Sequence, residues 1–500
     1  MTLPVMPLLS KSAYINGWQC PKRLWLQTHQ PHDTEAANGA GGRFRKGREI
    51  GEWARQLFPA GKLVTTEPYS PEAAVDQTRA LIASGARVIF EAAFTWNDCF
   101  AAVDILVRKG SSWHVYEVKS GTSVKEYYLQ DMAFQYQVLK GAGISVTKCF
   151  ILHVDNRYER SGAILPELLL KQVPVTRAIR NLQREVAAHT AQLKPVLDPA
   201  ASCPERDIGL HCQTPHPCPY TGQCWSHIPS PSIFDIVHLG GAKKFQLYYE
   251  GIYRQDQLPE GYSLTSMQQL QVEATRSGLP VVDAAAIGQW LAKLRYPVYL
   301  LDFECFQPAV PLYHRTRPYQ QIPFQFSMHK SNTPGVESGH REFLAEAGPD
   351  PRPAFIESLL DACGTEGTIL AYNKAFELGR LRELARDFPE YRESLEALIA
   401  RMGDLMEPFE KKWYYAPDMQ GSHSIKRVLP ALVPGEHYSA LAIADGQQAS
   451  EAYEAMFFMD GQEALEATKR DLLAYCKLDT LAMVLIMDKL FLAASAVDAP

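Results

Sequence analysis

Alternating hydrophobic and polar positions divide the first part of the chain into short elements. After a helical opening come three apolar runs, VIFEAAFTW, CFAAVDILVRK and SWHVYEVKSG, separated by the polar turns WND and GSS. A period of two with short turns predicts an antiparallel meander of strands. The stretch EYYLQDMAFQYQVLKGAG then has apolar residues at helical spacing and ends on Gly141, and KCFILHVD predicts a further strand after it.

The pattern changes twice along the rest of the chain. Residues 231–293 predict a helical connector, in which KKFQLYYEGI and LPEGYSLTSMQQLQ suggest paired short helices that grip a DNA backbone or, more simply, a packed linker. From residue 294, the apolar strand YPVYLLDFECF opens an alternation of strands and helices. We therefore expect an α/β protein with one domain over 1–230, a connector over 231–293 and a second domain over 294–500.

Composition agrees with a folded protein of more than one domain. A chain of 500 residues is too long for a single core, and 46% hydrophobic with 21% charged residues is typical of soluble globular proteins. Neither a run of about 18 apolar residues nor a secretion signal is visible, so we expect a cytoplasmic protein without membrane contact. The net charge of −6 argues against a surface that binds nucleic acid non-specifically throughout, but metal-binding carboxylates contribute negative charge themselves, so net charge does not decide the partner.

Two carboxylates follow each other on the predicted strand LLDFE. Side chains alternate along a strand, so Asp302 and Glu304 share one face. Two such charges beside an apolar strand repel unless a cation compensates them, and oxygen ligands favour Mg²⁺ or Mn²⁺. Glu377 follows the turn AYNKAFE, and Asp404 opens the DLMEPF segment.

Tyr475 and Asp479 lie one helical turn apart in AYCKLDT. Two metal ions about 4 Å apart would activate a water and stabilise the leaving oxygen, and a tyrosine hydroxyl would hold that water in line. The segment GSHSIKRVLPAL offers Ser422, Ser424 and Lys426 as contacts to a phosphate or strand, whereas a helix N-cap by Ser424 is the plainer account.

In this order, LLDFE, AYNKAFE and YCKLD resemble the three motifs of DnaQ-like, RNase H-fold exonucleases of the DEDD class, in the form with a motif-three tyrosine. The resemblance implies 3′ to 5′ hydrolysis, with Asp302, Glu304 and Asp479 as metal ligands and Tyr475 orienting the water. Glu377 stands where aspartate is commoner in that family, so Asp404 is a rival for this role.

The N-terminal meander carries a second group of polar residues. Asp104 interrupts an apolar strand, and Glu117 and Lys119 share one face of the next strand. Asp104 and Glu117 can bind Mg²⁺, while Lys119 can position the attacking water or stabilise charge on a phosphate. The alternative is a simple surface pair of Glu117 and Lys119.

The motifs SAYINGWQCPKRLWL, FRKGREIGE, EAAF, AAVDIL, YEVKSG and DMAFQYQVL resemble, in order, RecB-type PD-(D/E)XK nucleases. The likeness is greatest to the CRISPR-associated and AddB-like members that carry an iron-sulfur cluster. The resemblance implies a catalytic triad of Asp104, Glu117 and Lys119. Glu91 and Gln135 match supporting positions, and Glu49 and Glu52 lie near the first motif, where that family often has a histidine.

Cysteines gather between residues 212 and 224, with the spacing C-x5-C-x5-C. Together with Cys20 they supply four thiolates, which satisfy either zinc or an iron-sulfur cluster. The candidate ligands are Cys20, Cys212, Cys218 and Cys224, with Cys203 as a spare thiol and His211, His216 and His227 as further zinc ligands. The resemblance favours a 4Fe-4S cluster that clamps the two ends of the first domain. The remaining cysteines are interpreted as small apolar residues: Cys99, Cys149, Cys305, Cys363 and Cys476.

Together, the two resemblances match a bacterial fusion of an iron-sulfur RecB-type nuclease with a DnaQ-like exonuclease. They predict a metal-dependent nuclease that acts on DNA, from single-stranded ends, in repair, recombination or defence against foreign DNA. Two alternatives stay open: one module is an inactive scaffold that binds nucleic acid, or the substrate is RNA, since two-metal chemistry does not involve the 2′-hydroxyl.

Overall fold

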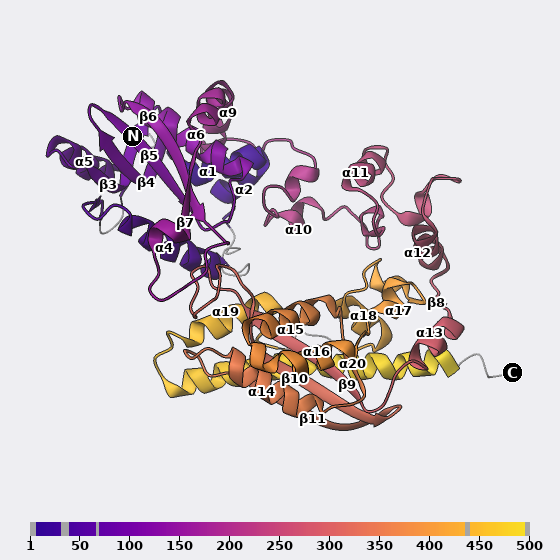
Figure 1. The fold of residues 1–500 in the computed structure, drawn as a ribbon. Coiled ribbons are helices and arrows are strands. Elements are labelled where there is room, and N and C mark those ends of the chain that lie inside the picture. Colours follow the sequence, from indigo (N-terminus) through magenta and orange to yellow (C-terminus); the bar gives the residue numbers. More distant parts are fainter. Residues whose placement is uncertain (1–6, 32–39, 67–69, 436–440, 496–500) are drawn as a thin grey trace. The chain divides into compact units, whose positions relative to one another are not determined.

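The computed structural model describes residues 7–31, 40–66, 70–435 and 441–495 (Figure 1). It has two compact units. The first contains residues 1–227 and 308–320, and the second contains 228–307 and 321–500. Both combine helices with a sheet, so the predicted α/β class is confirmed.

The first unit is built on a seven-stranded sheet in which the strands follow the order β2-β3-β4-β5-β6-β7, and β1 lies parallel to the start of β4. Strands β3, β4 and β5 are antiparallel neighbours, which confirms the predicted meander. The strands are β1 (Leu9–Ser10), β2 (Lys62–Leu63), β3 (Val88–Trp96), β4 (Cys99–Lys109), β5 (Ser112–Lys119), β6 (Val146–Val154) and β7 (Leu170–Pro174).

Helices cover both faces of this sheet. Because side chains alternate along β6, Cys149 and Ile151 pack in a core with α1, α6 and α9, whereas Phe150 and Leu152 pack in a second core with α4. The predicted helix that ends on Gly141 is α6. The helices are α1 (Lys11–Gln19), α2 (Pro21–His29), α4 (Ala40–Gln56), α5 (Pro71–Ala83), α6 (Glu126–Gly141), α7 (Pro166–Leu169), α8 (Thr176–Asn181), α9 (Gln183–Leu193) and α10 (Thr221–Cys224).

Residues 308–320 complete the first unit from a distant part of the chain. Ala309 and Val310 are buried in the core that also contains α4. A guanidinium N–H of Arg160 donates to the carbonyl of Pro311 at 3.0 Å, and the Tyr319 hydroxyl donates to the carbonyl of Ser120. The first unit is thus not one continuous segment, which differs from the boundaries predicted from the sequence.

The segment can be tested through Val310, which is 4% exposed in this core. Val310→Asp is expected to destabilise the first unit by about 3 kcal/mol, because the new carboxylate is buried without a cation. Hydrogen exchange of β6 should accelerate. The same substitution at Val336, which is 55% exposed, is the matched control and should leave β6 unchanged. Equal protection of β6 in both variants would contradict the assignment of this segment to the first core.

The second unit is built on a five-stranded sheet with the order β11-β10-β9-β12-β13. The central strand β9 is antiparallel to β10 and parallel to β12. The strands are β8 (Val281–Val282), β9 (Val298–Phe306), β10 (Ile322–Thr333), β11 (Val336–Leu344), β12 (Thr368–Ala371), β13 (Met402–Asp404) and β14 (Tyr414–Tyr415).

One face of this sheet packs on α14, α15 and α16, and the other contacts the long helix α20 (Figure 1). Leu301 and Phe303 of β9 point into the core that the sheet forms with α14, α15 and α16. The helices are α11 (Gly241–Tyr249), α12 (Ser266–Ser277), α13 (Ala284–Leu291), α14 (Arg352–Cys363), α15 (Ala375–Asp387), α16 (Arg392–Ala400), α17 (Glu407–Glu410), α18 (Ile425–Leu432), α19 (Gly446–Met456) and α20 (Gln462–Ser495).

The region predicted as a separate helical connector belongs to the second unit. It is not wholly helical, because Val281 and Val282 pair with Tyr415 and Tyr414 in a two-stranded sheet. The backbone N–H of Asp283 also donates to the carbonyl of Trp413 at 2.7 Å. These pairings tie the connector to residues more than a hundred positions later, which local periodicity cannot reveal.

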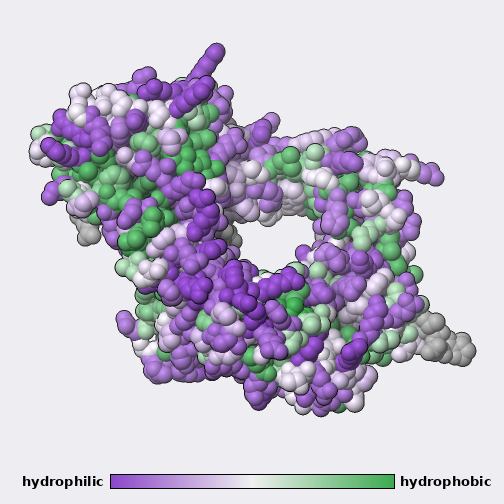
Figure 2. All heavy atoms as spheres, in the orientation of Figure 1, coloured by the Kyte–Doolittle hydropathy of each residue, from purple (hydrophilic) through white to green (hydrophobic). Residues whose placement is uncertain are grey.

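The surface drawn in Figure 2 is mainly hydrophilic, with hydrophobic residues interspersed. Among the described residues, every helix is too short or too polar to cross a bilayer.

Candidate metal centres

The first candidate centre lies on β9 of the second unit. Asp302 and Glu304 are opposite Ser327 and Gln325 in the register with β10. Leu301 and Phe303, the alternate residues, face the other side of the sheet. The structure therefore places both carboxylates together on the face that contacts α20.

A thiol of α20 joins these carboxylates. Ligand atoms of Asp302, Glu304 and Cys476 all lie within 4.8 Å of one another, and the sulfur of Cys476 is 3.8 Å from Oδ2 of Asp302. The interpretation of Cys476 as an ordinary apolar residue is incomplete, because its thiol borders the acidic group. A signal was present in the sequence, since Cys476 precedes Asp479 by three residues and so shares its helix face.

Burial and mutual repulsion raise the pKa values of these carboxyl groups. Burial raises the pKa of Asp302 well above its ordinary range, and the nearby charges of Asp479 and Glu304 raise it further. Burial, followed by the charge of Asp479, raises the pKa of Glu304 to about 8. Several buried carboxylates at one point favour protons or a divalent cation as the compensating charge.

Glu377 and Asp404, the two rival acids, differ in their hydrogen bonds. Oδ1 of Asp404 accepts from the backbone N–H groups of Asn373 and Met406, at 3.0 and 2.9 Å, and Oδ2 accepts from that of Lys374 at 3.1 Å. Asp404 therefore holds the start of α15 in place.

Glu377 is 2% exposed, and its Oε2 has no hydrogen-bond partner. Burial raises the pKa of Glu377 to about 8, and its charge contributes to the raised pKa values of Asp302 and Glu304. Of the two acids, Glu377 is thus the one with a buried carboxylate oxygen that makes no hydrogen bond.

Lys426 lies near the ring of Tyr475, and its charge acts on Glu304 of the same group. Tyr475 is 4% exposed, and Nζ of Lys426 is 5.8 Å from the centre of its ring. The positive charge of Lys426 opposes the rise in the pKa of Glu304, an effect smaller than those of burial and Asp479. Ser424 precedes α18 at the N-cap position, but its side chain makes no capping hydrogen bond, so the expected cap is absent.

Raised carboxylate pKa values predict how stability depends on pH without metal. The folded-state pKa of Glu304 and Glu377 is about 8, against an ordinary value of 4.5, so the folded state binds more protons between these values. In EDTA, the free energy of unfolding of the second unit should therefore fall as the pH rises from about 5 to 8. Mg²⁺ should reverse the loss, measured by urea unfolding with pulsed hydrogen exchange of β9.

Glu304→Gln should flatten this pH dependence, because the amide cannot ionise. Glu393→Gln, at an exposed glutamate of α16, serves as the matched control and should preserve it. If the second unit were equally stable in EDTA at pH 6 and pH 8, this would be evidence against the raised pKa values of Glu304 and Glu377.

The second candidate centre lies on β4 and β5 of the first unit. The structure brings Asp104, Glu117 and Lys119 together. Oδ2 of Asp104 accepts from the backbone N–H of Val118 at 2.7 Å, and Nζ of Lys119 donates to Oε1 of Glu117 at 2.8 Å. Glu117 is 1% exposed, so the pair is not a simple surface contact.

Helix α6 adds two polar side chains to this centre. Gln135 donates to Oε2 of Glu117 at 2.8 Å and to Oδ1 of Asp131 at 2.9 Å. Lys119 also donates to Oδ2 of Asp131 at 2.6 Å. Sequence reasoning found Gln135 but missed Asp131, although the two are four residues apart and therefore share a helix face.

A second lysine, Lys11, also reaches the centre and was not predicted. Its Nζ is 3.4 Å from Oδ1 of Asp104 and 3.2 Å from Oε1 of Glu117. Nothing local in the sequence marks it, because it precedes these residues by about ninety and about a hundred positions.

The other residues suggested for this centre lie around it. Glu91 of β3 pairs with Arg55 of α4 at 3.0 Å, and its charge acts on Lys11. Glu49 and Glu52 are on α4, where Glu49 is half-buried and Glu52 is exposed.

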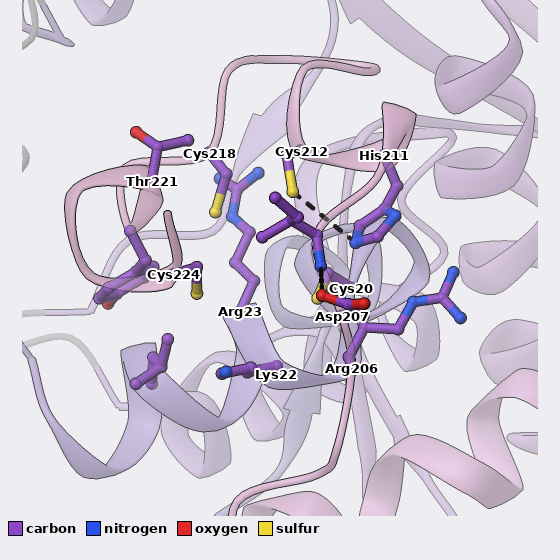
Figure 3. Close-up of a pocket in the computed structure, with 13 residues that line it drawn as sticks. Cys20, Lys22, Arg23, Arg206, Asp207, His211, Cys212, Cys218, Thr221 and Cys224 are labelled. Carbon is purple, nitrogen blue, oxygen red and sulfur yellow. Dashed lines mark hydrogen bonds between the residues drawn. The ribbon is translucent and has the colours of Figure 1, made fainter. Parts of the chain in front are cut away.

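The cysteines Cys20, Cys212, Cys218 and Cys224 line one pocket of the first unit (Figure 3). Cys20 lies between α1 and α2, and the others come from the 212–224 segment. Gln19 anchors this segment, because its amide donates to the carbonyls of His211 and His216, each at 2.7 Å. The four thiols are thus brought to one place from both ends of the domain.

The pocket is narrow because Arg23 runs between the sulfurs (Figure 3). The remaining cavity is about 20 Å³, which holds about one water. Nε2 of His211 is 3.8 Å from the sulfur of Cys212, and Cys203 is near enough for its charge to act on Cys224. In the described part of the chain, the four sulfurs do not form a group within 4.8 Å of one another.

A family model and a known protein are similar to parts of the chain. The model of a family described as a domain of unknown function (DUF2779) matches residues 299–424. This span contains Asp302, Glu304 and Glu377 and ends before Tyr475 and Asp479. Uncharacterized protein UU173 of Ureaplasma parvum serovar 3 (strain ATCC 700970) is 28% identical over 156 residues, covering 28% of this chain and 22% of that protein. The chain therefore matches only about a fifth of that relative.

Proposed function

We propose that this protein is a metal-dependent nuclease with two hydrolytic centres, acting on DNA in the cytoplasm. The observation that carries the proposal is the acidic group of half-buried Asp302 with buried Glu304 and Glu377, whose pKa values are all raised. A cluster of this kind at the centre of a mixed sheet supports an RNase H-like exonuclease unit. The meander with Asp104, Glu117 and Lys119 supports a PD-(D/E)XK unit.

In the second unit, Asp302, Glu304, Asp479 and Glu377 would hold Mg²⁺ or Mn²⁺. Such ions supply Lewis-acid stabilisation and an activated water when bound. Tyr475 would orient the attacking water through its hydroxyl. Hydrolysis adds the water oxygen to phosphorus, breaks the bond from phosphorus to the 3′ oxygen, and gives a proton to that departing oxygen.

In the first unit, Asp104 and Glu117 would hold one divalent cation. Gln135 fixes the orientation of Glu117, and the Val118 N–H fixes that of Asp104. Lys119, held by Glu117 and Asp131, would donate hydrogen bonds to the phosphate as its negative charge grows. The covalent change is again hydrolysis of a phosphodiester.

We further propose that Cys20, Cys212, Cys218 and Cys224 bind a 4Fe-4S cluster. Thiolates on one zinc ion lie about 3.8 Å apart, because each Zn–S bond is about 2.3 Å. The four thiols line one pocket, and an iron-sulfur cluster would bind each of them at a different iron corner. Arg23 would leave the pocket on binding, and the cluster would clamp the two ends of the domain.

Removing one cluster ligand should weaken the first unit. Protein purified without oxygen is expected to be brown and to contain iron, and Cys212→Ser should lose both iron and about 3 kcal/mol of stability. Cys149→Ser, at a buried thiol outside the pocket, is the control for iron content. A colourless protein that contains stoichiometric zinc would overturn the choice of metal.

The proposed activity is tested on matched oligonucleotides. We expect Mn²⁺ to support cleavage of end-labelled single-stranded DNA and EDTA to abolish it. An RNA strand of the same sequence would show whether cleavage depends on the sugar. Duplexes of both would show whether it depends on a single strand. Cleavage of RNA alone would redirect the proposal to RNA, and tight binding without cleavage would favour a scaffold.

A further inference from the structure

Lys11 occupies an unusual position for a lysine. It is the first residue of α1, where the helix dipole disfavours positive charge. Burial, the largest single cause, lowers the pKa of Lys11, but the surrounding carboxylates, led by Asp104 and Glu117, together raise it above the ordinary range. The carboxylates therefore compensate a charge that the helix itself does not favour.

The position of Lys11 is fixed by its surroundings. Leu9 and Ser10 pair with Cys99 and Phe100 of β4, and the hydroxyl of Ser10 caps α1 by accepting from Ala13 at 3.2 Å. One turn later, Tyr14 is fully buried and stacks on Phe134 of α6, with ring centres 4.7 Å apart. The ammonium group is therefore directed at the centre by structure on both sides.

The charges around the centre limit how many cations it holds. Asp104, Glu117 and Asp131 give three negative charges, and Lys11 and Lys119 give two positive charges, which leaves a net charge of −1. One divalent ion brings the sum to +1, which suits one phosphate. A second divalent ion would meet the positive charge of Lys11 at the same two carboxylates.

We propose that Lys11 is a catalytic residue that takes the place of a second metal ion, so that the first unit binds one divalent cation and Lys11 contacts the scissile phosphate. This inference rests on the proposed nuclease function of the same centre. Its chemical role is to stabilise negative charge on the phosphate oxygens, beside Lys119 and the single metal ion.

The test uses the full chain with Asp302→Asn and Glu304→Gln, so that the second unit loses two of its proposed metal ligands in every protein compared. Mn²⁺ binding is measured by calorimetry, and cleavage of end-labelled single-stranded DNA is measured in parallel. Lys11→Met should tighten Mn²⁺ binding about tenfold, since a positive charge is removed beside the ligands. The same variant should slow cleavage about a hundredfold. Opposite changes in the two measurements are the signature of the proposal.

Two further variants serve as controls. Lys11→Arg keeps the charge and should keep Mn²⁺ affinity near that of the parent. Lys125→Met removes an exposed lysine of the same unit and should alter neither measurement.

Other outcomes overturn the proposal in distinct ways. Weaker Mn²⁺ binding together with slower cleavage would show that Lys11 has a structural role. A gain in both would show that Lys11 inhibits the centre. No change in either would make it a bystander. If the parent itself neither binds Mn²⁺ nor cuts DNA, the nuclease function of the first unit fails too, whatever Lys11 does.

Discussion

Asp302→Asn is expected to slow the release of mononucleotides from the 3′ end of single-stranded DNA by about a thousandfold or more. Asparagine keeps the shape of the side chain but removes the negative charge that would hold the metal. The same change removes one of several carboxylates that repel one another, so stability in EDTA at pH 8 should rise. Activity and stability are therefore expected to change in opposite directions.

That contrast separates a catalytic from a structural role for Asp302. Asp471→Asn, at an exposed aspartate of α20, is the matched control and should leave both quantities unchanged. Loss of activity together with loss of stability in the Asp302 variant would instead indicate that the carboxylate supports the fold.

Lys119→Met is expected to slow cleavage by the first unit by about a hundredfold to a thousandfold, measured in protein that carries Asp302→Asn. Lys119 donates to both Glu117 and Asp131, so its removal eliminates a cation from the centre of the site. Lys109→Met, at an exposed lysine at the end of β4, is the matched control and should keep full activity.

A second change distinguishes lost chemistry from lost folding. Without Lys119, Asp131 is left near Glu117 with less compensation, and the first unit is destabilised. Adding Asp131→Asn should restore thermal stability but not cleavage. Recovery of cleavage in this double variant would show that Lys119 acts through the fold alone.

Local patterns predicted much of the fold. Strands β3 to β5 alternate with period two, and α6 has the spacing of an amphipathic helix that ends on glycine. What the patterns missed depends on contacts between distant residues. Residues 308–320 pack into the first unit because Val310 finds an apolar core there, and Val281 forms a strand only because Tyr415 pairs with it.

In the candidate centres too, local geometry was predictable from the sequence, whereas contacts between distant segments were not. Asp302 and Glu304 share a face because strand geometry requires it, and Tyr475 and Asp479 share one because helix geometry requires it. The bonds of Asp404 to the start of α15 depend on how β13 lies beside β12, which spacing does not encode. Lys11 joins its centre through the pairing of β1 with β4, again a contact between distant segments.

The central claim is that one chain holds two independent metal-dependent nuclease centres. The most direct test is a Mn²⁺ time course on 3′- and 5′-labelled single-stranded DNA, run with the parent, Asp302→Asn, Lys119→Met and the double variant. We predict that each single variant loses a different set of products and that the double variant cuts nothing. Unchanged products in both single variants, or full cleavage by the double variant, would contradict the account.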